Sequence, residues 1–261
     1  MVTESRPASR LWVDTDIALG AARGDVDDGL ALAAIACAHL AGDVELLGVS
    51  ATFGNTDAAT AERCARDLLD AAGLAETQVV GAREAPAALA SLEEGAQIVA
   101  LGPLANVAAA LDVDSELPAR TSLSVVATVL GRNPLLASYC LNFRKDPEAA
   151  RRAMRAGFSP RRVFPLDTVR RLRVGRSQLE ELAAVGPLGE RLAVGSRRWL
   201  RSAPWRYLSF SFPAWDLVAA LAAVDRLPDA RFDEEQRLVD FDVERAWQEF
   251  VALVGARGRE A

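Results

Sequence analysis

The chain has 261 residues, of which 51% are hydrophobic and 25% are charged, and its formal net charge is −6. This composition is typical of a soluble globular protein, and the scattered arginines argue against nucleic-acid binding. Its three cysteines form no CxxC pair, which disfavours a disulfide framework and favours a reducing, cytoplasmic setting. We expect no signal peptide, because the first ten residues lack its apolar core. We also expect no membrane span, because no apolar run reaches roughly 18 residues.

Short strand-like runs alternate with helix-like runs along the chain. Strands are predicted at 11–14, 44–52, 78–81, 97–101, 122–130 and 162–166. Helices are predicted at 29–40, 58–72, from about 103, at 147–156 and over most of the chain after 178. This alternation predicts an α/β fold with an open, mostly parallel central sheet and helices on both faces. We expect a single domain over residues 1–261, with ligands beyond the carboxyl ends of the strands.

Four aspartates lie where the first predicted strand leads into the first predicted helix: Asp14, Asp16, Asp27 and Asp28. Asp14 and Asp16 are two residues apart, so their side chains leave a strand on one face. The helix start, with its free N–H groups, favours the other two carboxylates. Such a cluster repels itself unless a cation neutralises it, and hard oxygen ligands suit Ca²⁺ or Mg²⁺. The alternative, one helix cap and one strand end, does not explain all four aspartates.

An Asp-x-Asp at the end of a first strand also resembles the haloacid-dehalogenase phosphatases. Those enzymes need a distant catalytic lysine, and Lys145 is the only lysine in this chain. Because Lys145 lies in a motif that resembles another family, an Asp-x-Asp phosphatase is the less favoured alternative.

Six motifs, in order, resemble the inosine–uridine-preferring nucleoside hydrolase family. They are the aspartate cluster, Gly54-Asn55, the segment 101–108 (LGPLANVA), Asn142 followed by 146–150 (DPEAA), 165–167 (PLD) and Asp216. Each motif alone is weak, but their shared order covers most of the chain. The resemblance implies a nucleoside hydrolase-like fold with a Rossmann-like core.

The resemblance also implies a Ca²⁺ ion held by Asp16, Asp28, Asp216 and the backbone carbonyl of Leu101. Asp16 would also be the catalytic base that takes a proton from the metal-bound water. The implied substrate-binding residues are Asp27, Asn55 and Asn142, with Asp14 in support and Asn133 one position out of the family register. A cation lowers the pKa of its water, and nearby carboxylates stabilise the oxocarbenium-like sugar that forms as the glycosidic bond breaks.

Three features depart from the family pattern. The spacing between Asp16 and Asp27 is longer, and we expect the inserted segment, 17–26, to lie over the pocket. Trp215 replaces the histidine assigned to protonating the leaving base, so it either stacks on the base as a substrate-binding residue or only fills space. Cys140 replaces a glutamate that contacts the sugar 5′-hydroxyl. We interpret His39, the only histidine, as structural, so no histidine is expected to activate Cys140 as a nucleophile.

The sequence therefore predicts a calcium-dependent N-ribohydrolase that cleaves a nucleoside or related riboside to ribose and base, as in purine or pyrimidine metabolism. The main alternative is a non-catalytic protein that binds a metal and a riboside. We expect a small-molecule partner, no nucleic acid or membrane, and a homodimer or homotetramer by family analogy. The base and any 5′ substituent on the sugar are left open.

Overall fold

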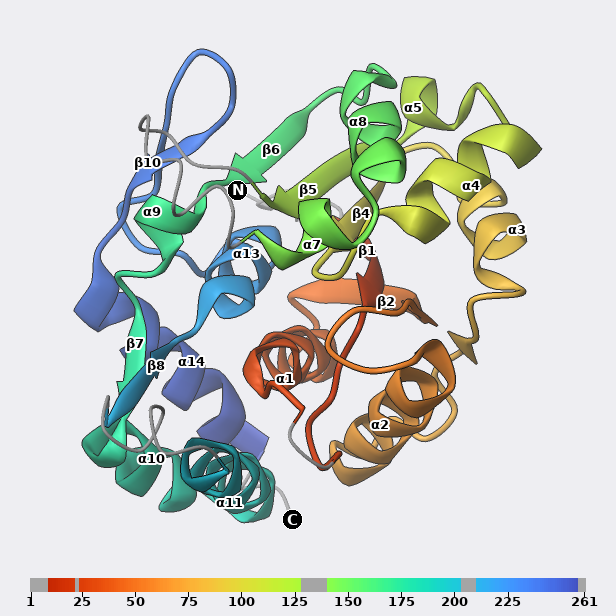
Figure 1. Cartoon of the computed structure of the whole chain (residues 1–261). Coiled ribbons are helices and arrows are strands. Elements are labelled where there is room, and N and C mark those ends of the chain that lie inside the picture. Colours follow the sequence, from red (N-terminus) through yellow and green to blue (C-terminus); the bar gives the residue numbers. More distant parts are fainter. Residues whose placement is uncertain (1–8, 22–23, 128–139, 203–209, 258–261) are drawn as a thin grey trace, which may run out of the picture.

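The computed structural model describes residues 9–21, 24–127, 140–202 and 210–257. Its centre is a six-stranded sheet with helices on both faces (Figure 1). The strands are β1 (Ser9–Thr15), β2 (Val44–Ala51), β3 (Val79–Val80), β4 (Ala96–Ala100), β5 (Ser122–Val126) and β6 (Arg161–Phe164). Their order is β3-β2-β1-β4-β5-β6, and every neighbouring pair is parallel. The predicted α/β fold is confirmed, and all six predicted strands are present.

Helices cover the two faces of this sheet and build two apolar cores. They are α1 (Asp27–Leu40), α2 (Ala58–Ala71), α3 (Ala85–Ala90), α4 (Ala105–Val113), α5 (Leu117–Arg120), α7 (Leu141–Lys145), α8 (Pro147–Arg155), α9 (Leu166–Val169), α10 (Arg176–Ala183), α11 (Pro187–Arg201), α13 (Trp215–Ala223) and α14 (Val243–Arg257). One core joins α1, α2, α13 and α14, and the other joins α3, α4 and α8. Because both cores share one sheet, we propose that the chain folds as a single domain.

The central strand β1 is buried on both faces. Leu11 and Val13 contribute to one core and Trp12 to the other, because successive side chains of a strand point to opposite faces. Helix α1 is buried along almost its whole length, which explains why its sequence is apolar all round rather than amphipathic. A largely buried strand and a largely buried helix are therefore joined by the segment that carries the aspartates.

The strand order reverses direction between β1 and β4, since the chain first adds β2 and β3 on one side of β1 and later adds β4 to β6 on the other. At such a switch point the connections leave β1 and β4 toward opposite faces, so a crevice opens beyond their carboxyl ends. The fold thus places a ligand site where Asp14, Asp16 and Leu101 emerge.

Two short antiparallel sheets were not predicted from the sequence. One pairs β7 (Arg173–Gly175) with β8 (Ser211–Pro213), and the other pairs β9 (Arg231–Phe232) with β10 (Leu238–Asp240). The prediction of a mostly helical chain after 178 is therefore incomplete, because strands this short show no periodicity. Within the described ranges, no helix is both long and apolar enough to cross a membrane.

Candidate active site

Three strand ends meet at the switch point. Asp16 follows β1, Asn55 follows β2, and Leu101 follows β4. The Leu101 N–H donates to the Asp14 carbonyl oxygen over 2.8 Å, which continues the hydrogen bonding of the sheet. The backbone N–H of Asn55 donates to Asp16 Oδ2 over 2.5 Å. The end of β2 therefore fixes the orientation of the carboxylate that follows β1.

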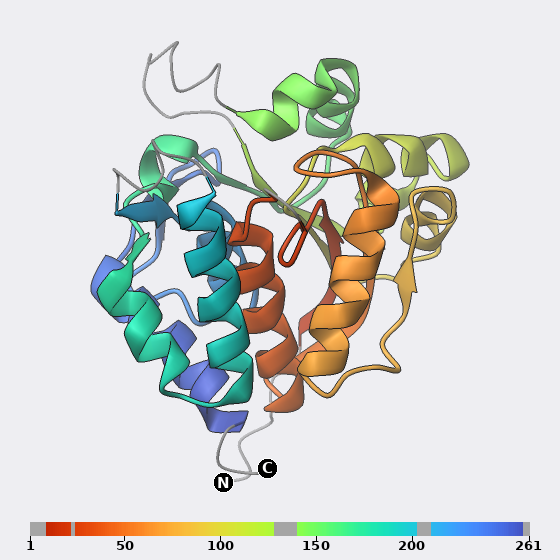
Figure 2. The same ribbon diagram turned by 60° about the horizontal axis from the view of Figure 1, so that its bottom comes forward.

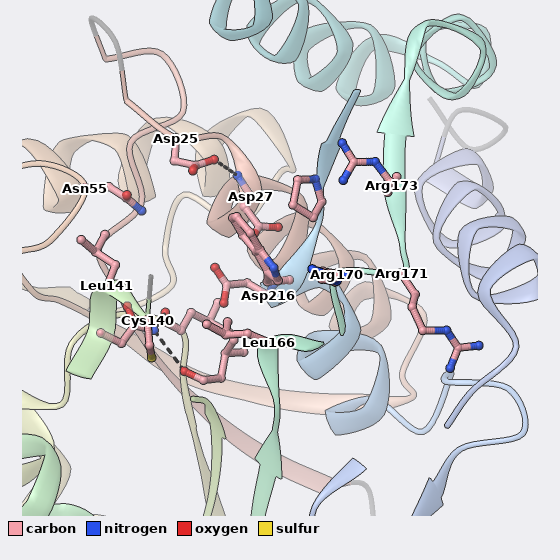
Figure 3. Close-up of a pocket in the computed structure, with 15 residues that line it drawn as sticks. Asp25, Asp27, Asn55, Cys140, Leu141, Leu166, Arg170, Arg171, Arg173 and Asp216 are labelled. Atoms are coloured by element: carbon pink, nitrogen blue, oxygen red, sulfur yellow. Dashed lines mark hydrogen bonds between the residues drawn. The ribbon is translucent and has the colours of Figure 1, made fainter. Parts of the chain in front are cut away.

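Two helices begin at the same place and supply three more carboxylates. Asp27 and Asp28 form the first turn of α1, and Asp216 lies in the first turn of α13. The backbone N–H of Asp216 donates to Asp27 Oδ2 over 3.1 Å. Asn55 Nδ2 donates to Asp28 Oδ2 over 3.2 Å. The structure thus gathers carboxylates from both ends of the chain around one crevice (Figure 3).

Helix capping does not account for Asp27 and Asp28. The N-cap of α1 is Val26, and no side chain makes a cap hydrogen bond there. Asp25 instead accepts hydrogen bonds at Oδ1 from the N–H groups of Val26, over 2.7 Å, and Asp27, over 3.3 Å. The capping interpretation is therefore wrong for these two residues, and Asp25 is a further acidic residue of the site that sequence reasoning did not assign.

Two glycines lie against Asp16, which explains why two of the sequence motifs contain glycine. A Cβ atom at Gly54 would lie 2.0 Å from Asp16 Oδ2, and one at Gly102 would lie 2.9 Å from Asp16 Oδ1. The loops after β2 and β4 can approach this carboxylate only because neither position carries a side chain.

Burial and mutual repulsion dominate the electrostatics of the cluster. Burial, followed by the charges of neighbouring aspartates, raises the pKa values of Asp16, Asp27 and Asp216 well above the usual range. Burial also raises the pKa of Asp28 to about 6, although the Thr15 hydroxyl, which donates to its Oδ1 over 2.5 Å, opposes this. Without a compensating cation, the cluster therefore retains protons near neutral pH.

Asp14, like Asp16 and Asp28, is not among the residues that line the cavity beside the cluster, whereas Asp27 and Asp216 are. Asp14 is fully buried and accepts hydrogen bonds at Oδ1 from the Ser50 hydroxyl, over 2.5 Å, and from Asn106 Nδ2, over 2.8 Å. Burial raises its pKa to about 6 despite these two donors. Its contacts connect β1, β2 and α4 beneath the site.

The oxygen atoms of the cluster fit a hard divalent cation in their chemistry. Asp16 Oδ1 and Asp27 Oδ1 are buried and have no hydrogen-bond partner in the described structure, and such atoms are costly to bury without a donor or a cation. However, no group of three or more His, Cys, Asp or Glu side chains among the described residues is already arranged around a metal position. The hydrogen bonds of the cluster instead run from Asn55 to Asp16 and Asp28 and from the Asp216 N–H to Asp27.

A cavity of about 860 Å³ opens in front of the cluster. Its walls include predicted site residues, namely Asp27, Asn55, Leu101, Cys140, Asn142, Trp215 and Asp216. Cavities of this size bind small molecules of nucleoside size or larger. Asn142 Nδ2 donates to the carbonyl of Leu101 over 2.7 Å and to that of Val126 over 3.3 Å. The Leu101 carbonyl keeps a second lone pair for a further ligand.

The other predicted residues lie as follows. Asn133 lies outside the described residues. His39 lies near the end of α1 remote from the aspartates, where its Nδ1 is 3.3 Å from both the Val44 carbonyl and the Leu46 N–H. Cys140 is 3% exposed and lines the cavity, whereas His39 is not among the residues that line it. The roles given to all of these residues stay predictions.

The inserted segment does not cover the cavity in its described part. Leu19 is buried between α1 and α11, where a Cβ atom at Gly29 or Gly195 would collide with it. Figure 2 shows α2, α1 and α11 on the same side of the sheet. Among the described residues of 17–26, Asp25 lines the cavity. The expectation that this segment lies over the pocket is therefore wrong for its described apolar residues, because Ile17, Leu19 and Val26 are buried in the core.

Three cavity-lining arginines, Arg170, Arg171 and Arg173, were not singled out from the sequence. They follow α9 and extend into β7, where the antiparallel pairing sets Arg173 opposite Pro213. The signal that could have found them is the run RRLR, which begins three residues after Asp167, the last residue of the PLD motif.

The chain is similar to proteins of one known family in sequence and in fold. The model of the inosine-uridine preferring nucleoside hydrolase family matches residues 86–250, which is more than half of the chain. No protein with curated function matches the chain in sequence.

Solved structures with the same fold include both enzymes and effectors. A plant nucleoside hydrolase is 19% identical, with a TM-score of 0.75 over 96% of this chain and 100% of that chain. A purine-preferring ribonucleoside hydrolase from Gardnerella vaginalis is 17% identical, with a TM-score of 0.74 over 97% and 100%. The type III effector protein XopQ, solved with adenosine diphosphate ribose, is 17% identical, with a TM-score of 0.71 over 96% and 94%. At these identities the likeness shows a shared fold.

Proposed function

Because this chain belongs to the inosine-uridine preferring nucleoside hydrolase family, we propose that it is a calcium-dependent N-ribohydrolase that releases ribose from a nucleoside or related riboside. The observation that supports this most strongly is the buried carboxylate cluster beside a ligand-sized cavity that Asp27 and Asp216 line. Two of its oxygens, Asp16 Oδ1 and Asp27 Oδ1, have no hydrogen-bond partner in the described structure. A buried, self-repelling cluster in such a place is best explained by a cation and a polar ligand.

In this proposal Asp16, Asp28, Asp216 and the carbonyl of Leu101 hold the ion. When bound, a divalent cation lowers the pKa of a coordinated water toward neutrality. Asp16 Oδ2 is held by the Asn55 N–H, so Oδ1 is the atom of this carboxylate that can accept a proton. Because burial and the neighbouring aspartates raise the pKa values of these carboxylates, formation of the ion site requires the cluster to release protons.

The ribose is the second ligand of the proposed site. Asp27 Oδ1 and Asn142 line the cavity beside the carboxylates, and we assign them to the ribose hydroxyls. The negative charges around the sugar stabilise the positive charge that develops as the glycosidic bond breaks. We assign Asn55, which contacts both Asp16 and Asp28, to orienting the attacking water.

Trp215 is the first residue of α13 and lies half-buried in the cavity wall. An indole cannot act as the general acid that a histidine provides, which is worth about 10²- to 10⁴-fold in rate. We propose that Trp215 stacks on the leaving base and that the enzyme favours bases that leave with little help. The second candidate function, riboside binding without turnover, is motivated by the same residue and by the effector proteins that share this fold.

The test is release of reducing sugar from a panel of purine and pyrimidine nucleosides, with Ca²⁺ and with a chelator. We expect turnover that needs Ca²⁺ and is lost in Asp16→Ala. The matched control is Asp112→Ala, which removes a surface carboxylate paired with Arg152 outside the site. Thermal stabilisation by ribosides with no sugar released from any of them would favour the binding protein instead.

We propose a cytoplasmic location and a homodimer or homotetramer by family analogy, and both stay predictions.

A further inference from the structure

The cavity carries positive charge opposite its carboxylates. Figure 3 shows Arg170 and Arg173 beside the cavity, with Asp25 and Asn55 on the other side, whereas the Arg171 side chain extends away. The arginines come from the end of α9 and from β7, and the cavity-lining carboxylates come from the segment before α1, from α1 and from α13. One cavity therefore has two walls of opposite charge.

The three arginines differ in their partners. Arg171 forms an ion pair with Asp240, with 2.6 Å between Nη1 and Oδ1, and its guanidinium lies over the ring of Phe241. Arg173 donates to the hydroxyl and the carbonyl of Ser211, over 3.0 and 2.9 Å, and both of these partners are neutral. The Arg170 side chain is exposed and makes no hydrogen bond or ion pair with any described residue. Among the described residues, no carboxylate pairs with Arg170 or Arg173, so both keep their positive charge at the cavity.

These arginines do not serve to neutralise the aspartates. In the described structure no ion pair joins an arginine to Asp16, Asp27, Asp28 or Asp216. The cationic wall is thus available to a ligand that also reaches the carboxylates.

The two walls are held in a fixed relation. Arg173 pairs with Pro213 across β7 and β8, and the Ala214 N–H donates to the Leu172 carbonyl over 2.8 Å. Trp215 and Asp216 follow directly, so the segment that carries the arginines is hydrogen-bonded to the segment that leads into α13. A ligand that bridges the two walls would meet them at a set spacing, which favours specific over loose binding.

A guanidinium binds best to a planar or tetrahedral anion with several acceptor oxygens, and phosphate is the common one. A neutral nucleoside would leave both arginines without an anion. We propose, on the basis of the proposed riboside site, that the preferred ligand is a riboside bearing a phosphate group, such as a nucleoside 5′-phosphate. The aspartates and the cation bind its ribose, and Arg170 and Arg173 bind its phosphate.

Binding is the first test, because it does not depend on turnover. Ribose and ribose 5-phosphate are titrated by calorimetry into the full chain with Ca²⁺ present. We expect ribose 5-phosphate to bind about 10- to 100-fold more tightly, as charge-assisted hydrogen bonds predict. Added sodium chloride should weaken ribose 5-phosphate binding more than ribose binding. Equal affinities, or tighter binding of ribose, would overturn the phosphate proposal.

Variants locate the phosphate site. Arg170→Ala should lower the affinity for ribose 5-phosphate by about tenfold or more, and Arg170→Lys should retain part of it. For Arg173→Ala, thermal unfolding is measured alongside the affinity, because this substitution also removes the hydrogen bonds to Ser211. The control is Arg176→Ala, an exposed arginine of the same segment that pairs with Glu180 and should change neither affinity. An Arg170→Ala protein that binds ribose 5-phosphate as the wild type does would contradict the assignment.

Measurements of turnover distinguish a failure of the phosphate proposal from a failure of the proposed hydrolase function. Inosine and uridine are compared with their 5′-monophosphates and 5′-diphosphates for release of base, and kcat/KM should be at least about tenfold higher for one of the phosphorylated forms. If the free nucleosides are the better substrates, the phosphate inference fails and the hydrolase stands. If no riboside of either kind is bound or cleaved, both fail.

Discussion

The backbone N–H of Asp216 donates a hydrogen bond of 3.1 Å to Asp27 Oδ2, across 189 positions of the chain. This bond joins the first turn of α13 to the first turn of α1. Asp27 Oδ1 has no hydrogen-bond partner in the described structure. One oxygen of Asp27 therefore positions a proposed metal ligand, and the other is available to a ribose hydroxyl.

Two substitutions of Asp27 should separate these tasks. Asp27→Asn keeps a carbonyl oxygen for the Asp216 N–H but loses the charge, so KM for the riboside should rise about 10- to 100-fold with Ca²⁺ affinity largely retained. Asp27→Ala loses both and should also weaken Ca²⁺ binding. Steady-state kinetics and calorimetry measure the two effects, and identical Ca²⁺ affinities in the two variants would contradict the positioning role.

Loss of a proposed metal ligand should abolish Ca²⁺ binding but should raise the thermal stability of the metal-free protein. Asp28→Asn and Asp216→Asn should each abolish Ca²⁺ binding, measured by calorimetry. In a chelator, the same variants should unfold at a higher temperature than the wild type, because each removes a buried carboxylate whose pKa is raised by burial and by its neighbours. Unchanged Ca²⁺ binding in both would refute the ligand assignment. Asp112→Asn, at the surface, is the control.

Asp14 should make the metal-free protein less stable as the pH rises. Its folded pKa of about 6 exceeds the unfolded value of 3.8, so the folded state holds the proton more tightly. Its contribution is fully present below pH 3.8 and is lost as the pH rises through about 6. We expect a loss of roughly 3 kcal/mol at most, measured by urea unfolding in a chelator.

Asp14→Asn is the control for this pH dependence, because its carbonyl oxygen can still accept from Ser50 and Asn106. The variant should lose less stability than the wild type between pH 4 and pH 6.5. The same slope in both proteins would assign the pH dependence to other groups.

The sequence was sufficient to predict the parallel sheet and to predict that aspartates lie at the carboxyl end of β1. Buried strands and a buried helix produce long apolar runs, and the motifs lie at strand ends where the fold makes them meet. Asp216 could be associated with the cluster only through the family resemblance, since no local pattern reveals a contact between α13 and α1.

The cationic wall could not be predicted in the same way. Arg170 and Arg173 lie on a four-residue helix and a three-residue strand, which are too short to show a period. Leu19 was expected near the pocket because the loop is inserted there, but its burial against α11 depends on Gly195, far along the chain. Such contacts depend on tertiary packing rather than on local sequence.

Gly54→Ala should damage the site while leaving the fold intact. Its new Cβ atom would lie 2.0 Å from Asp16 Oδ2, so the proposed base must move. A displacement of about 1 Å costs on the order of 100-fold in rate. We expect kcat to fall by that amount with far-UV circular dichroism unchanged. Gly255→Ala adds the same methyl group to α14, away from the site, and should leave kcat unaltered.

Trp215 decides between the two interpretations of the altered acid position. If the indole stacks on the leaving base, Trp215→Phe should retain most of the activity, and Trp215→Ala should raise KM for purine ribosides by about tenfold or more, since base stacking on an aromatic ring is worth roughly 1–3 kcal/mol. If Trp215 only fills space, Ala and Phe variants should differ in thermal stability but not in KM.

Trp215→His tests the missing acid directly. An imidazole at the start of α13 would lie at the cavity wall next to Asp216, where it could donate a proton to a leaving base. For ribosides with poor leaving groups we expect kcat to rise, by up to about 10²- to 10⁴-fold, and to decline as the pH exceeds the imidazole pKa. Ribosides with activated leaving groups should gain little, because they need no protonation. An equal gain for both classes, or no pH dependence, would show that the histidine acts through packing rather than proton transfer.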